Sequence, residues 1–329
     1  MKSRLIRLSA VAAAAVLALG ACSSGGGGTH GGESSGAEGS AELTKLTVAV
    51  SPGAATSTPM YLAADRGVFA EHGLEVELIV LEDGAVAIPN TLNGQTQFSM
   101  AGFGSAVQAI EKGIPIRLIG AANVIPTDPD SKYQAVMVNK EAGITEASQI
   151  ETWAADSTEV DPSHAFTIDT LGGDYASLTK IAVPFPAIGD AVADGTVDAA
   201  FVNEPFLSAA IETGKVDVLS YVTGDLTIPG APGAVFIGAI EYMDENPEIT
   251  AQFMAAIQEA YSYAAENLEE VAEFVPSTGL NDQVPPVVAL GEYQVGPLKA
   301  DQVQPLLDVF AKYGAIEGRI PASEMIRTS

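Results

Sequence analysis

The chain has 329 residues, of which 15 are basic and 42 acidic, for a formal net charge of −27 at pH 7. A surface this negative argues against binding to nucleic acid and against direct adhesion to anionic lipid headgroups. Hydrophobic residues make up 47% of the chain and there is a single cysteine. The chain can therefore build two ordinary cores, but no internal disulfide.

The N-terminus predicts an export signal over residues 1–21. Three basic residues among the first seven precede an apolar run over 8–19, which is too short to span a bilayer. The next residues, Leu19-Gly20-Ala21-Cys22, match the lipobox of bacterial lipoproteins. This resemblance implies cleavage before Cys22 and lipid attachment to its sulfur. A nucleophilic cysteine would need a histidine partner, and the chain has only three histidines.

A linker follows the anchor. Residues 22–43 consist mainly of Gly, Ser, Glu and Ala, a composition that cannot form a core and is typical of a flexible tether. No later apolar stretch reaches membrane-spanning length, so we expect the lipid on Cys22 alone to hold the protein to the membrane.

Strands and helices alternate along the first part of the folded region, which predicts an α/β fold with a largely parallel sheet. Thr58 is the expected N-cap of a helix that starts at Pro59, and Ser105 with Gln108 forms an expected capping box. The expected elements are a strand over 46–50, a loop over 51–58, a helix from 59 to about 67, a strand over 74–81, a helix over 88–92, a strand over 98–101, a helix ending at 113 and a strand over 116–120.

The second half contains an echo of the first. With a shift of 101 residues, 92–118 aligns without a gap on 193–219, so that Gly94 falls on Gly195 and Gly113 on Gly214. The same order of helix end, glycine, strand, loop, helix, glycine and strand occurs in both copies. No third copy follows, so the sequence predicts two similar α/β lobes rather than a repeat array.

The last hundred residues are expected to be mainly helical. Asn246 and Pro247 mark a helix start. The following apolar residues recur every four positions and predict a core-facing stripe: Ile249, Phe253, Ile257 and Tyr261. A further helix is expected over 305–313.

Ligands of open α/β sheets bind beyond the carboxyl ends of the strands, next to helix N-termini. This rule selects five loops: 51–58, 81–86, 102–105, 170–173 and 203–205. The echo makes 102–104 and 203–205 equivalent, and two lobes that present equivalent loops to each other form a cleft. The expected ligand-binding residues are Thr56, Ser57, Thr58, Asp83, Gly102, Phe103, Ser105, Thr170, Gly172, Gly173, Asn203 and Glu204.

Motifs of catalysis are absent. The chain has no Gly-x-Ser-x-Gly elbow, no His-Glu-x-x-His and no phosphate loop. Gly102-Phe103-Gly104 resembles the start of a dinucleotide motif, but Val107 occupies the position of the third glycine. His72 and His164 have no second metal ligand near them in sequence. We expect no catalytic residue, metal or cofactor.

Several blocks together resemble the substrate-binding components of nitrate/sulfonate/taurine and pyrimidine-precursor ABC importers. The blocks are PMYLAADRGVFAEHGLEVELIVLEDG, TLNGQTQFSMAG, VPFPAIGDAVADGTVDAAFVNEPF and the lipobox. The resemblance covers 44–329 and implies a type II periplasmic-binding-protein fold, in which two α/β lobes joined by two hinge crossings close around a ligand.

The resemblance implies that 44–137 and 233–329 form lobe 1 and that 138–232 form lobe 2. The crossings are then expected near 137–141 and 227–235. One departure from the family stands out, because few residues follow Gly172-Gly173 before the next strand, whereas 153–164 reads as a polar loop. We therefore expect a trimmed second lobe.

Two solute classes stay open. Helix N-termini at Thr58, at Gly104-Ser105 and after Gly173 would favour a small anion such as a sulfonate, taurine or nitrate. Glu204 and the acidic pair at 82–83 instead favour a ligand with N–H donors, such as a pyrimidine or thiamine precursor or an amine. The sequence supports equally well that Glu204 caps the helix after Pro205 instead of contacting a ligand.

The expected function is that of a monomeric extracytoplasmic solute receptor, anchored to the cell membrane through Cys22. It would deliver a small polar solute to the permease and ATPase subunits of an ABC importer. The alternatives are a lipid-anchored enzyme on the same fold and an adhesion or scaffold lipoprotein.

Overall fold

The computed structural model of the chain describes residues 42–51, 54–81, 86–125, 129–155, 158, 161–184, 187–204, 206–228, 230–280 and 297–328. Cys22, the linker up to residue 41 and Asp83 lie outside the described residues. Those that are described belong to one unit of the chain, Ala41–Ser329. None of the described helices combines the length and apolar character needed to cross a bilayer.

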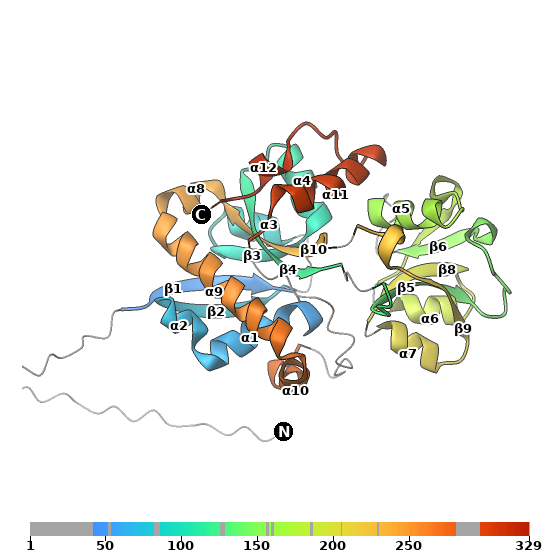
Figure 1. The fold of residues 1–329 in the computed structure, drawn as a ribbon, viewed down its shortest axis with the longest axis horizontal. Helices are drawn as coiled ribbons and strands as arrows, with labels where there is room; N and C mark the ends of the chain where they lie inside the picture. Colours follow the sequence, from blue (N-terminus) through green and yellow to red (C-terminus); the bar gives the residue numbers. More distant parts are fainter. Residues whose placement is uncertain are drawn as a thin grey trace, which may run out of the picture. The chain divides into compact units, whose positions relative to one another are not determined.

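The first sheet has five strands in the order β2-β1-β3-β10-β4 (Figure 1). β1 pairs in parallel with β2 and β3, whereas β10 is antiparallel to both of its neighbours. We call this sheet and its helices lobe 1. Its strands are β1 (Thr44–Val50), β2 (Leu74–Val80), β3 (Phe98–Gly102), β4 (Ile116–Val124) and β10 (Pro232–Ala239).

Helices cover both faces of the lobe 1 sheet, in two groups. One apolar cluster joins the sheet to α1 (Ala54–Arg66), α2 (Val68–Glu71), α8 (Ile240–Glu245), α9 (Pro247–Glu266) and α10 (Leu268–Thr278). The other joins it to α3 (Ala87–Leu92), α4 (Phe103–Glu111), α11 (Ala300–Lys312) and α12 (Ala322–Met325). The expected stripe of α9 is confirmed as core, since Phe253, Ile257 and Tyr261 are buried in the first cluster.

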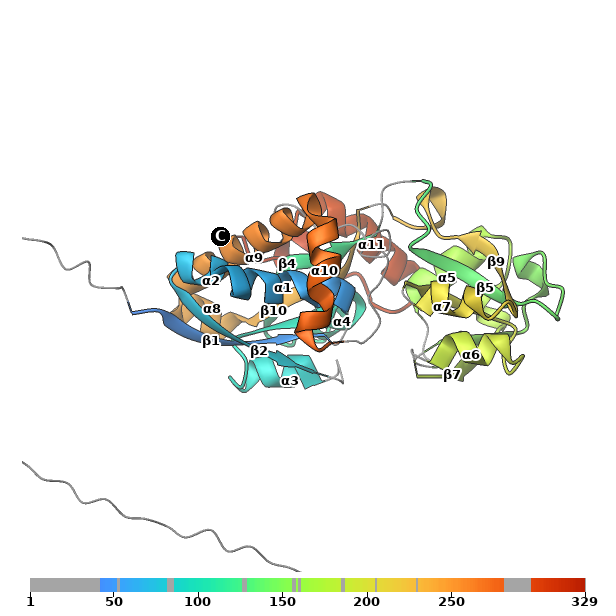
Figure 2. The same cartoon turned by 90° about the horizontal axis from the view of Figure 1, so that it is seen from below.

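Lobe 2 is built on a second five-stranded sheet, in the order β7-β6-β8-β5-β9. Its strands are β5 (Gln134–Asn139), β6 (Thr152–Ala155), β7 (Thr179–Ala182), β8 (Ala199–Asn203) and β9 (Val216–Tyr221). α6 (Ile188–Ala193) and α7 (Phe206–Glu212) pack on one face. On the other face lies α5 (Pro162–Thr170), which is labelled in Figure 1 and Figure 2. The 3-10 turns η2 (Ala147–Gln149), η3 (Tyr175–Ser177) and η5 (Gly224–Leu226) belong to the same face.

The 101-residue echo is confirmed as a structural repeat. α3 and α6 begin and end at equivalent positions, as do β3 and β8. The paired glycines keep the same backbone, with φ of +76° at Gly94 and +69° at Gly195, and +82° at Gly113 and +69° at Gly214. The sheet orders also correspond, with β10 in one sheet and β5 in the other as the antiparallel fourth strand.

Three helix starts differ from expectation. α1 begins at Ala54 rather than Pro59, so Ser57 and Thr58 lie inside the helix. α4 begins at Phe103, with Gly102 as an N-cap that makes no side-chain hydrogen bond, so Ser105 is not a cap. α11 begins at Ala300 rather than 305. In each case good helix formers or a buried aromatic residue extend the helix N-terminally past the proline or serine.

The trimming of lobe 2 relative to the family stays a prediction, but within this chain the two lobes match in the segment concerned. The segment 153–164, expected as a polar loop, contains most of β6 and the first turn of α5. The connections from β1 to β2 and from β6 to β7, 51–73 and 156–178, have equal length. The helix expected after Gly172-Gly173 lies before them instead, because Asp161-Pro162 supplies an N-cap and a proline at the first turn.

The first lobe boundary lies earlier than expected. β5 begins at Gln134 and pairs with β8 and β9 along its whole length, so Met137 lies in the middle of a lobe 2 strand. The chain therefore passes from lobe 1 to lobe 2 between Val124 and Gln134, and returns between Tyr221 and Pro232. The two crossings are bonded to each other, with Ile125 N donating to Ala231 O at 2.8 Å and Gly230 N to Ile125 O at 3.1 Å.

Candidate functional site

A pocket of about 450 Å³ is lined by residues of both lobes and of both crossings, and we call it the interlobe pocket. It lies where α4 follows β3 in lobe 1 and where α5 follows β6 in lobe 2. Both are carboxyl ends of parallel strands, the place where open α/β sheets bind ligands.

Lobe 1 contributes the start of α4 and one face of α11. Gly102, Phe103, Gly104, Ser105 and Gln108 line the pocket from α4, and Leu306 and Phe310 line it from α11. The rings of Phe103 and Phe310 meet edge to face, with centroids 5.6 Å apart. A Cβ on Gly104 would lie 3.1 Å from the Phe310 ring, so glycine allows α11 to pack closely here.

Lobe 2 contributes the start of α5 and the end of β8. Asp161 caps α5, and its Oδ1 accepts hydrogen bonds from Ser163 N at 2.8 Å and His164 N at 3.1 Å. The imidazole of His164 stacks on the ring of Phe201 with centroids 4.7 Å apart. All four residues line the pocket, together with Pro162, Thr167 and Ala155.

The crossings and the strand ends beside them complete the lining of the pocket. Ile125 lies in the first crossing and Thr227 in the second, whereas Gln134 begins β5 and Pro232 and Gly233 begin β10. The amide of Gln134 donates weakly to Val222 O, at 3.4 Å. A change in the angle between the lobes would thus be transmitted directly to residues that face the pocket.

Three of the expected ligand residues are brought together here, since Gly102, Phe103 and Ser105 all line the interlobe pocket. The expected trio of α1 lies outside the lining. Ser57 and Thr58 are fully buried, and Ser57 Oγ donates to Ser51 O at 2.8 Å. The Oγ atoms of Ser51 and Thr56 are also hydrogen-bonded, at 2.8 Å. The hydroxyl groups of Ser51, Thr56 and Ser57 stabilise the start of α1, whereas the buried Thr58 hydroxyl has no hydrogen-bond partner among the described residues.

The expected loop 170–173 lies at the wrong end of α5. Thr170 is in the last turn of the helix, where its hydroxyl donates to Phe166 O at 2.6 Å. Gly172 has a φ of +84°, the left-handed backbone typical of a helix C-terminus. Gly173 packs against α5 and η2. Carbonyl groups, not N–H groups, end the helix here, so this loop offers no anion site.

Glu204 acts as a helix cap. Its two carboxylate oxygens accept from Ser208 N at 3.1 Å and from Ser208 Oγ at 2.6 Å, in the first turn of α7. Neither Glu204 nor Asn203 lines the interlobe pocket. Both lie beside Tyr133, whose pKa is raised to about 12 by burial, against an opposing hydrogen bond from Asn203 and together with the charge of Glu204.

Sequence reasoning missed the whole lobe 2 wall of the pocket. Its signal was present, because Asp161-Pro162 followed by Ser163 is a helix start of the same kind as Asn246-Pro247. No group of described residues could hold a metal ion.

A family model described as NMT1/THI5 like matches residues 54–271, which is more than half of the chain. The chain belongs to the NMT1/THI5-like family. Among curated relatives, the formylaminopyrimidine-binding protein of Halalkalibacterium halodurans is 23% identical over 222 residues. That match covers 66% of this chain and 64% of the relative, so the chain spans somewhat less than two thirds of the relative's length.

Solved structures confirm the fold. The alkanesulfonate-binding protein SsuA of Xanthomonas axonopodis pv. citri, bound to MOPS, matches with a TM-score of 0.67 and 16% identity, over 88% of this chain and 100% of that one. The ligand-binding component of an ABC-type import system of Staphylococcus aureus, with zinc bound, matches with a TM-score of 0.69 and 12% identity, over 87% of this chain and 97% of that one. These relatives and neighbours are binding proteins of the periplasmic-binding-protein fold, not enzymes.

Proposed function

We propose that this protein is the solute receptor of an ABC importer, which captures a small polar solute in the interlobe pocket by closure of the two lobes and delivers it to a membrane permease. The observation that carries the proposal is the pocket itself. Its lining comes from both lobes and both crossings, which is the arrangement that hinge closure around a ligand requires.

The two expected solute classes differ in how much support they keep. The sulfonate, taurine or nitrate class rested on three helix N-termini. One of these is now a helix C-terminus, one lies inside α1, and only the start of α4 lines the pocket. The class of pyrimidine or thiamine precursors and amines rested on Glu204, whose carboxylate caps α7. The mixture of aromatic, amide and hydroxyl side chains in the lining favours this second class on new grounds.

The lipid anchor and the extracytoplasmic location belong to the same proposal, and the lipobox at Cys22 supports them. A receptor tethered to the membrane stays close to its permease. Substitution Cys22→Ser in the full chain should abolish incorporation of labelled palmitate and release the protein from the membrane fraction. Retention of label in that variant would contradict the anchor.

A thermal-shift screen of the full chain tests the receptor function. The panel contains alkanesulfonates, taurine, nitrate, pyrimidine precursors, thiamine and amines. A solute at 100 times its Kd should add about 2.7 kcal/mol to the free energy of unfolding, which raises Tm by several degrees. A well-folded protein with an unchanged Tm across the whole panel would reject the receptor proposal.

A further inference from the structure

Among its described lining residues the interlobe pocket has one carboxylate, Asp161, one histidine, and no lysine or arginine. A cleft lined by one sign of charge concentrates solutes of the opposite sign.

The site is poorly built for an anion. An anion at the start of α5 would need the free N–H groups of its first turn. Those of Ser163 and His164 already donate to Oδ1 of Asp161. The carboxylate also places a negative charge where an oxyanion would have to bind, which costs free energy in a site that excludes water.

The apolar part of the lining suits a flat cation. Phe103 and Phe310 meet edge to face in lobe 1, and Phe201 with His164 forms a stacked pair in lobe 2. All four side chains line the same pocket. Aromatic faces attract cations, and the attraction is stronger when the cation is desolvated. The described contacts of Asp161 use Oδ1, so Oδ2 can accept a hydrogen bond from a ligand.

We propose that the solute is an organic cation with a flat apolar face, such as an amidinium or a protonated aminopyrimidine-like ring, with its charge at Asp161 and its ring between the two aromatic pairs. This inference rests on the receptor function and specifies its ligand class. It replaces Glu204 with Asp161 as the recognising carboxylate.

Three probes of equal size separate charge from shape: benzamidinium, neutral benzamide and anionic benzoate. We expect isothermal titration of the full chain, in a non-ionic detergent, to give a benzamidinium affinity at least about tenfold above that of benzamide. Benzoate should bind more weakly than benzamide. A preference for benzoate, or no binding of benzamidinium, overturns the cation proposal. The receptor function is judged separately, by whether any compound of the broad panel binds.

The variant Asp161→Asn tests the position of the charge. Asparagine is as good an N-cap as aspartate, so α5 should keep its start, and far-UV circular dichroism and Tm check this. Benzamidinium affinity should fall about tenfold or more, whereas benzamide affinity stays within a factor of two.

The control is Asp174→Asn, because Asp174 also caps a turn of lobe 2, with Oδ1 accepting from Ala176 N at 3.2 Å, but does not line the pocket. It should leave both affinities unchanged. An equal loss for benzamidinium in both variants, or no loss in Asp161→Asn, overturns the assignment of Asp161.

Discussion

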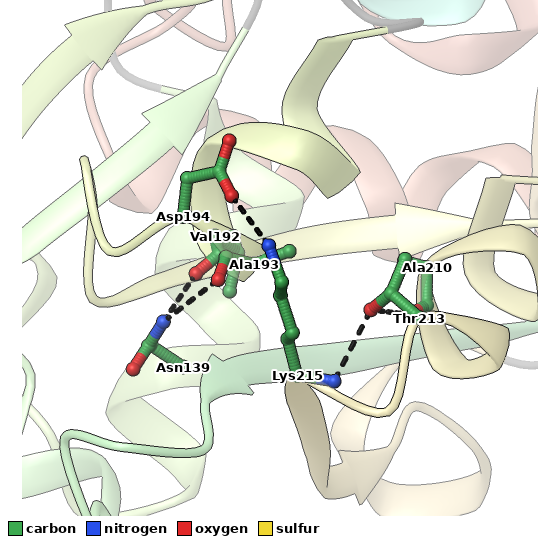
Figure 3. Close-up of polar contacts among 7 residues, drawn as sticks. All are labelled: Asn139, Val192, Ala193, Asp194, Ala210, Thr213 and Lys215. Atoms are coloured by element: carbon green, nitrogen blue, oxygen red, sulfur yellow. Dashed lines mark hydrogen bonds and ion pairs between the residues drawn. The ribbon is translucent and has the colours of Figure 1, made fainter.

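Asn139 and Lys215, two polar side chains of lobe 2, show how burial decides how much a hydrogen bond contributes to stability (Figure 3). Asn139 is 7% exposed. Its Nδ2 donates to Val192 O at 2.7 Å and to Ala193 O at 3.4 Å, and its Oδ1 accepts from Glu141 N and Ala142 N. Lys215 bonds Asp194 at 2.9 Å, but both side chains are more than half exposed.

Substitution Asn139→Ala should lower the free energy of unfolding by about 2–4 kcal/mol, because it removes all the hydrogen bonds that this buried side chain makes to the backbone. Substitution Lys215→Met should change it by less than about 1 kcal/mol, since solvent and salt screen an exposed ion pair. Urea unfolding followed by circular dichroism measures both. Equal losses in the two variants would contradict this assignment of roles.

Residue roles in the pocket could be predicted only in part. Gly102, Phe103 and Ser105 were found because a glycine between a strand and a helix marks the carboxyl end of that strand. The roles of Thr56, Ser57 and Thr58 could not be read in the same way. Small hydroxyl residues suit a ligand loop and the buried start of a helix equally well, and only packing separates the two.

At the scale of elements, the connection after α5 depends on a glycine that packs rather than binds. A Cβ on Gly173 would lie 2.8 Å from Ile168 Cγ2 and 3.1 Å from the carbonyl oxygen of Ala147. The carbonyl oxygen belongs to the backbone at η2 and cannot turn away. This close approach fixes α5 against η2, and thereby positions the pocket wall at the other end of the helix.

Substitution Gly173→Ala should therefore destabilise the protein by about 1–3 kcal/mol through overpacking. The matched variant is Gly102→Ala, where the nearest atom to the new Cβ lies 3.9 Å away and the backbone is extended. The free energy of unfolding of this variant should lie within about 0.5 kcal/mol of that of the parent chain. A larger loss at Gly102 than at Gly173, in the same urea titration, would refute the packing role.

The echo predicted the elements well where the shift of 101 residues and the paired glycines could be recognised, as in α3, β3, α6 and β8. It did not extend to β6 and α5, where the short strand Thr152–Ala155 is followed by polar residues before the helix begins at Pro162. The polar residues of this segment led to the prediction of a loop over 153–164. The antiparallel strands β5 and β10 were also beyond local reasoning, since their partners lie far away in sequence.

At the scale of the whole molecule, Tyr313 is a described side chain that joins the lobes away from the crossings. Tyr313, at the end of α11, donates its hydroxyl to Oδ2 of Asp169 in α5 at 2.9 Å. Its ring packs against the apolar cluster of lobe 2. Burial, with further contributions from the hydrogen bond and charge of Asp169, raises the pKa of Tyr313 to about 12.

Because this pKa is raised above the ordinary value of 10, the folded protein holds the phenol proton more tightly than the unfolded chain. The contact therefore stabilises fully below pH 10 and is lost as the pH rises through about 12. Tyr313→Phe should lower stability by about 0.5–1.5 kcal/mol at pH 8. It should also flatten the alkaline loss of stability in urea titrations between pH 10 and pH 12, whereas parallel pH profiles would argue against the contact.

The order in which the strands occur along the chain has a consequence for biosynthesis. Lobe 2 takes all five of its strands from one continuous stretch, β5 to β9, whereas β4 lies at the edge of its sheet beside β10. A chain made from its N-terminus completes the sheet of lobe 2 before β10 emerges. Until then, β3 and β4 of lobe 1 lack the strand that lies between them in the finished sheet. Lobe 1 begins first along the chain, but its sheet is completed after that of lobe 2.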